Sequence, residues 1–100
     1  MSIIKVHRRS EFANKLRGIP LYLNDREIAI INNDESKNFK IAPGKYRLIA
    51  KLDEGTSNEL EFEIAKNQEI KIQLTGRNLL IALFYATILK KNYLKLTILT

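Results

Sequence analysis

The chain has 100 residues, and its 17 Lys and Arg against 11 Asp and Glu give a formal net charge of +6. This length predicts a single domain around one core, and a hydrophobic fraction of 45% excludes wholesale disorder. The absence of Cys and the presence of one His exclude disulfides, thiolate chemistry and Cys- or His-rich metal clusters. We therefore expect no metal and no cofactor.

The N-terminal residues lack the long apolar core of a signal peptide, so we expect a cytoplasmic protein. Charge is distributed unevenly along the chain. Residues 1–20, 21–75 and 76–100 carry net charges of +4, −2 and +4. The excess positive charge therefore lies towards the two ends of the chain.

Most of the chain alternates between apolar and polar residues. Residues 45–52, 59–64 and 70–74 place apolar side chains on one face and charged side chains on the other. This alternation is typical of a sheet with one buried and one solvated face. Turn signals recur every 8–12 residues, and 10–18 reads as an irregular connection. The pattern predicts a mainly β protein, an antiparallel β-sandwich of about seven or eight short strands.

The charged faces of these strands predict a register. With Leu48 opposite Phe62, Arg47 lies opposite Glu63, and a following hairpin places Phe62 opposite Ile72. Cross-strand pairs of opposite charge contribute about 0.2–1 kcal/mol each. We therefore interpret the glutamates of residues 59–63 as a charge-paired sheet face and expect no metal or acid–base site there.

The pattern changes after residue 76. Residues 79–89 form an uncharged, Leu- and Ala-containing run between Arg77 and Lys90, which favours a helix over about 77–89. Such a helix is about 16 Å long, too short for the ~30 Å core of a bilayer. Residues 93–99 alternate again and predict a closing strand. We expect one domain over 1–100, with a β-sandwich body at 1–75 and the apolar helix and final strand at 76–100.

Residues 21–25 (LYLND), 39–48 (FKIAPGKYRL) and 70–74 (IKIQL) give the segment 19–75 a family resemblance. It resembles a PEGA-type domain, a small β-sandwich accessory module found across bacteria and archaea, and shares its Pro-Gly turn with transthyretin-like and immunoglobulin-like domains. Asp25 stands where that family usually has Gly. The resemblance implies a β-sandwich that serves as a binding or scaffold module and implies no catalytic residues.

No constellation of residues predicts catalysis. His7 lies between Val6 and Arg8 without a nucleophile motif, and the glycines are isolated rather than grouped in a phosphate-binding loop. We therefore expect a protein that is not an enzyme, with no catalytic and no metal-binding residues.

The apolar run predicts the main function. A helix that is apolar on all sides must be covered, and we expect a homo-oligomer, with a dimer favoured, that self-associates through this helix. The alternative is a peripheral membrane protein that uses the basic and apolar segment 77–95. The candidate contact residues are Leu79, Leu80, Leu83, Phe84, Tyr85 and Ile88.

A further alternative is weak, sequence-independent binding of nucleic acid through the basic N-terminal segment. The predicted charge pairing of the sheet argues against this function, and no small-molecule ligand is evident. The candidate anion contacts, for phosphates or lipid head groups, are Arg8, Arg9, Lys15, Arg17, Arg77, Lys90 and Lys91.

Overall fold

The computed structural model describes residues 1–9, 18–52, 55–76 and 94–99. This part of the chain contains only β-strands. They are β1 (Ser2–Arg8), β2 (Ile19–Leu23), β3 (Arg26–Ile31), β4 (Ser36–Ile41), β5 (Gly44–Leu52), β6 (Gly55–Thr56), β7 (Leu60–Ile64), β8 (Glu69–Gly76) and β9 (Leu94–Ile98).

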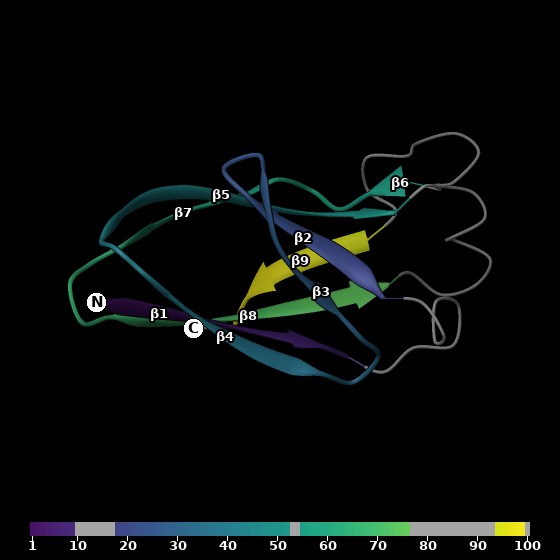
Figure 1. The fold of residues 1–100 in the computed structure, drawn as a ribbon, viewed down its shortest axis with the longest axis horizontal. Helices are drawn as coiled ribbons and strands as arrows, with labels where there is room; N and C mark the ends of the chain where they lie inside the picture. Colours follow the sequence, from purple (N-terminus) through teal and green to yellow (C-terminus); the bar gives the residue numbers. More distant parts are fainter. Residues whose placement is uncertain (10–17, 53–54, 77–93, 100) are drawn as a thin grey trace.

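The strands form two sheets (Figure 1). One has the order β4-β1-β8-β9, and the other has the order β3-β2-β5-β6, with β7 paired to β5. β1 pairs with β8 in parallel, whereas every other strand pair is antiparallel among the described residues. The sandwich is therefore mixed rather than purely antiparallel, because β1 lies in the middle of its sheet between two strands that run in opposite directions.

The core lies between the sheets. In β1, Ile4 and Val6 are fully buried, while the alternate residues Ile3, Lys5 and His7 are half-buried. β8 and β9 repeat this alternation, which explains why period-two sequence patterns mark the strands. The buried apolar residues of both sheets form one cluster, which consists of Ile4, Val6, Ile19, Leu21, Ile31, Leu48, Ala50, Phe62, Ile64, Ile70, Ile72, Leu74, Leu94 and Leu96.

The mainly β class and the two sheets agree with the sequence prediction, but the predicted fold class is wrong in its C-terminal helix. The described residues form nine strands and no helix. The range expected to be helical, 77–89, lies outside the described residues. The closing strand expected over 93–99 is β9, which continues the sheet of β8.

The predicted register is also wrong. Phe62 lies opposite Tyr46, two residues from the predicted partner, so Arg47 faces Glu61. β5 pairs with β6 with Leu52 opposite Gly55, and its pairing with β7 runs from Leu48 opposite Leu60 to Gly44 opposite Ile64. β7 and β8 do not form the expected hairpin, since β8 pairs with β1 and β9. The turn between them carries the chain from one sheet to the other.

The two sheets are joined along one side by the link between β6 and β7. Ser57 bridges to Leu94 of β9, and the side-chain amide of Asn58 pairs with the backbone of Leu96. Leu96 donates its N–H to Asn58 Oδ1 at 2.9 Å, and Asn58 Nδ2 donates to the Leu96 carbonyl at 3.2 Å. A side chain thus replaces a neighbouring strand at the edge of β9.

Candidate functional site

The outer surface of the four-stranded sheet is basic. Alternation with the buried residues places Lys40 of β4, Lys5 of β1, Lys71 of β8 and Lys95 of β9 on this surface. Glu69 is the one carboxylate that the four strands contribute to it among the described residues. We call this surface the basic face. It extends about 24 Å from Lys40 to Lys95, from strand spacing and residue rise.

Acidic partners neutralise little of the basic face. Lys5 Nζ lies 3.4 Å from Glu69 Oε1, and both side chains are more than 40% exposed. Lys5 and Lys71 occupy directly opposite positions on neighbouring strands, where like charges are destabilising. Among the described residues the face carries four lysines and one glutamate, so its net charge is positive and there are fewer carboxylates than lysines on the sheet.

Apolar side chains share the basic face. Leu99 follows β9, is 50% exposed, and donates its N–H to the Lys71 carbonyl at 2.8 Å. The alternation of β9 places Leu99 on the side of Lys95, and Ile3 of β1 lies half-buried on the same face. Phe39 lies opposite Ile4 and so faces inward. Strands β4, β1, β8 and β9 thus contribute lysines and aliphatic side chains to this face, and no Phe, Tyr or Trp.

His7 lies on the basic face with two close partners. Its Nδ1 is 2.7 Å from Ser36 Oγ, and its Nε2 is 3.7 Å from Asp34 Oδ1. Sequence reasoning missed this cluster, because the partners lie 27 and 29 positions away and meet only through the pairing of β1 with β4. All three residues are partly or fully exposed, His7 on β1, Ser36 at the start of β4 and Asp34 in the turn before it. They form one solvent-exposed polar cluster at the edge of the basic face.

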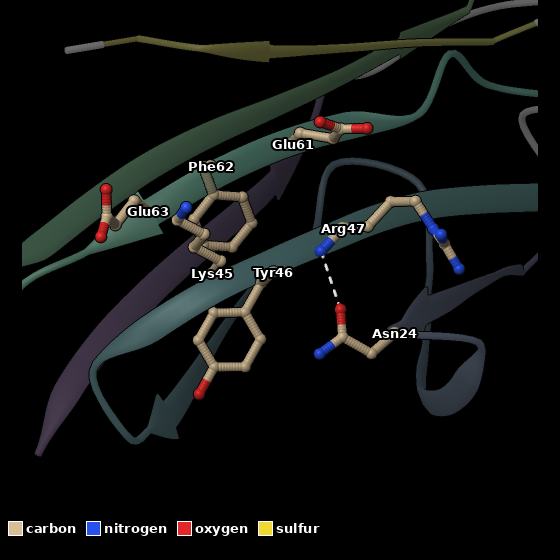
Figure 2. A pocket seen from close by; sticks show the side chains of 7 residues that line it. All are labelled: Asn24, Lys45, Tyr46, Arg47, Glu61, Phe62 and Glu63. Carbon is tan, nitrogen blue, oxygen red and sulfur yellow. Dashed lines mark hydrogen bonds between the residues drawn. The ribbon is translucent and has the colours of Figure 1, made fainter.

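A hollow with a volume of about 490 Å³ lies on the other sheet (Figure 2). Residues of β5 and β7 line it together with one residue of the turn after β2, and they are Asn24, Lys45, Tyr46, Arg47, Glu61, Phe62 and Glu63. The rings of Tyr46 and Phe62 stack with centroids 5.8 Å apart. Phe62 is buried and Tyr46 is half-buried, so the stacked pair extends from the core to this hollow.

Arg47 at this hollow is held by the turn between β2 and β3. Its backbone N–H donates to Asn24 Oδ1 at 2.9 Å, and its Nη2 lies 2.5 Å from Asp25 Oδ2. In Figure 2 the guanidinium points away from Glu63. The hydrogen bond and the charge of Asp25 raise the pKa of Arg47 further above its ordinary value. Arg47 of β5 thus forms an ion pair with Asp25 of the turn instead of the predicted pair with Glu63.

The structure places few of the predicted contact residues. Arg8 is fully buried, and its Nη1 donates to the Ile31 carbonyl at 3.1 Å. Arg9 is exposed directly after β1. The other predicted anion contacts, Lys15, Arg17, Arg77, Lys90 and Lys91, lie outside the described residues. The predicted self-association residues, Leu79, Leu80, Leu83, Phe84, Tyr85 and Ile88, also lie outside them.

Comparisons with known proteins returned no match among protein-family models, curated proteins or solved structures. The resemblance to PEGA-type domains therefore stays a prediction. In the part of the chain that the structure describes, no helix is long and apolar enough to cross a membrane. The described residues also contain no group of three or more His, Cys, Asp or Glu that could hold a metal ion.

Proposed function

We propose that this protein is a non-enzymatic module that binds the surface of anionic membranes through its basic face. The observation that carries the proposal is the composition of that face, where Lys5, Lys40, Lys71 and Lys95 share one sheet surface with the exposed Leu99. Peripheral membrane binding combines attraction of basic residues to anionic lipids with burial of apolar side chains at the head groups. The basic face offers both on one sheet.

The energies support reversible binding. Each lysine near an anionic membrane surface contributes about 1 kcal/mol. Four lysines against the one described glutamate of this face therefore contribute about 3 kcal/mol net, and insertion of Leu99 adds to this by removing apolar surface from water. This total corresponds to weak, salt-sensitive docking, because the attraction between exposed charges is screened over about 8 Å at physiological ionic strength.

The aliphatic character of the basic face favours a membrane over nucleic acid. Proteins that bind single-stranded nucleic acid stack bases mainly on Phe, Tyr and Trp, and the four strands of this face present none of these three outward. An exposed leucine gains little beside a phosphate backbone but gains from contact with lipid. The self-association hypothesis rests on residues 79–89, which lie outside the described residues, so it stays a prediction.

The test is co-sedimentation with vesicles of phosphatidylcholine and phosphatidylglycerol, compared with phosphatidylcholine alone. We expect binding only to the anionic vesicles, and weaker binding as salt is raised. The double variant Lys40→Gln/Lys71→Gln removes two charges from the basic face. At about 1 kcal/mol each, this change weakens binding about 30-fold.

The matched control is Arg26→Gln/Lys45→Gln, which removes the same charge from exposed positions on the other sheet. We expect it to weaken binding no more than about threefold, because its charges lie on another surface. Equal loss in both double variants would show that net charge alone drives binding and would refute the proposal. Retention of RNA or DNA by wild type at salt concentrations where vesicles do not bind would replace the membrane proposal with a nucleic-acid function.

A further inference from the structure

His7 makes the charge of the basic face dependent on pH. Its side chain is 41% exposed, so protons reach it from solvent. It lies on the strand that carries Lys5 and one strand away from Lys71, which lies opposite Lys5. Imidazole is the side chain whose charge ordinarily changes between pH 5 and 8. Protonation of His7 therefore adds one positive charge to a surface that already carries an excess of lysine.

The contacts of His7 are suited to both charge states. Ser36 Oγ, at 2.7 Å from Nδ1, can accept a hydrogen bond from a protonated ring or donate one to a neutral ring. Asp34 Oδ1, at 3.7 Å from Nε2, faces the other ring nitrogen and attracts the imidazolium. The ring can thus gain a proton without losing either neighbour, so the sheet need not rearrange when the charge changes.

The charges around His7 are mixed, but cations predominate on the face itself. The charged groups that surround it among the described residues are Lys5 and Arg9 from its own strand and the residue after it, Asp34 and Glu35 before β4, Lys40 on β4, Glu69 and Lys71 on β8, and Lys95 on β9. Lysines and carboxylates ordinarily keep their charge between pH 5.5 and 7.5, so the change over this interval comes from the imidazole.

We propose that protonation of His7 strengthens docking of the basic face on anionic lipid, so that the protein binds membranes more tightly at pH 5.5 than at pH 7.5. This inference rests on the proposed function. One added charge at an anionic membrane surface corresponds to about a fivefold increase in the binding constant. The device needs no ligand other than the proton.

The experiment measures binding to vesicles of phosphatidylcholine and phosphatidylglycerol at pH 7.5 and 5.5. Phosphatidylglycerol is used because its phosphodiester stays charged over this interval. We expect wild type to bind more tightly at the lower pH, by at most about fivefold. His7→Gln should bind equally at both pH values, at the level of wild type at pH 7.5. His7→Lys should bind equally at both, at the level of wild type at pH 5.5.

The outcomes separate this inference from the proposed function. Wild type that binds anionic vesicles equally at both pH values refutes the role of His7 and leaves the basic face as a membrane site. A pH effect that survives in His7→Gln also refutes it. No vesicle binding by wild type at either pH, at low salt, overturns both. Circular dichroism of each variant confirms that the substitutions at this exposed position leave the strands intact.

Discussion

Replacing Asn58 with alanine should separate β9 from the link between β6 and β7. The side chain of Asn58 makes two hydrogen bonds with the backbone of Leu96, at 2.9 and 3.2 Å, in a partly buried setting. A typical hydrogen bond contributes about 0.5–1.5 kcal/mol, and a buried group left without a partner costs about 1–3 kcal/mol. We therefore expect Asn58→Ala to lower the free energy of unfolding by about 2–3 kcal/mol.

The assay is urea denaturation followed by circular dichroism, with thermal unfolding as a second measure. In a domain of this size each kcal/mol shifts the Tm by about 4–8 °C, so the expected decrease is about 10–20 °C. Asn38→Ala is the matched control, because Asn38 is an exposed asparagine of the edge strand β4, and it should change stability by less than about 0.5 kcal/mol. A loss in Asn58→Ala as small as that of the control would refute the assignment of a strand-replacing role to Asn58.

Two further predictions concern the sheet of β5. Gly44→Ala should lower the free energy of unfolding by about 1–3 kcal/mol in urea titrations, because Gly44 has a φ of 153° that side-chain-bearing residues rarely adopt; an unchanged midpoint would contradict this. Desolvation, followed by the hydrogen bond to Glu27 and the charge of that carboxylate, raises the pKa of Tyr22. A raised pKa in the folded state contributes stability below the ordinary pKa of tyrosine, near 10, which is lost as the pH rises through the folded value. In a titration of tyrosine ionisation followed by ultraviolet absorbance, Tyr22→Phe should therefore remove a component whose pKa lies above 10, the ordinary value for tyrosine. Loss of a component with a pKa at or below 10 would contradict the raised pKa of Tyr22.

Sequence alternation predicted the strands well because burial on one face is a local property. In β8 the alternate residues Ile70, Ile72 and Leu74 are buried, as expected. Asn24 and Asp25, residue types that favour turns, form the hairpin between β2 and β3 with positive φ values of 50° and 68°. These features depend on near neighbours in the chain, which is why composition and spacing reveal them.

Strand partners were not predictable in the same way. The alternation of residues 59–64 fits a hairpin with β8 as well as it fits pairing with β5 alone, and nothing local shows that the turn after Ile64 crosses between sheets. The basic face could not be predicted from the sequence for the same reason, because it depends on which strands pair. Lys5 and Lys71 are 66 positions apart, and only the parallel pairing of β1 with β8 makes them neighbours.

Arg8 shows a different limit. Its position beside Arg9 in a basic segment predicted exposure, whereas alternation with Ile4 and Val6 places it inside. The alternation of β1 therefore predicts the burial of Arg8 correctly, whereas its charge does not. The carbonyl of Ile31 compensates part of the cost of burying the guanidinium, and no sequence signal connects these two residues.

The central position of β1 has a consequence for synthesis of the chain. Its antiparallel partner β4 begins at Ser36 and its parallel partner β8 begins at Glu69. During translation β1 leaves the ribosome before both partners, and its second neighbour begins about 60 residues after β1 ends. Contacts of such long sequence separation form slowly because the loop must close before they contribute. The nascent chain therefore presents β1 with an open edge until β8 emerges, and an unpaired strand edge is prone to aggregation during this interval.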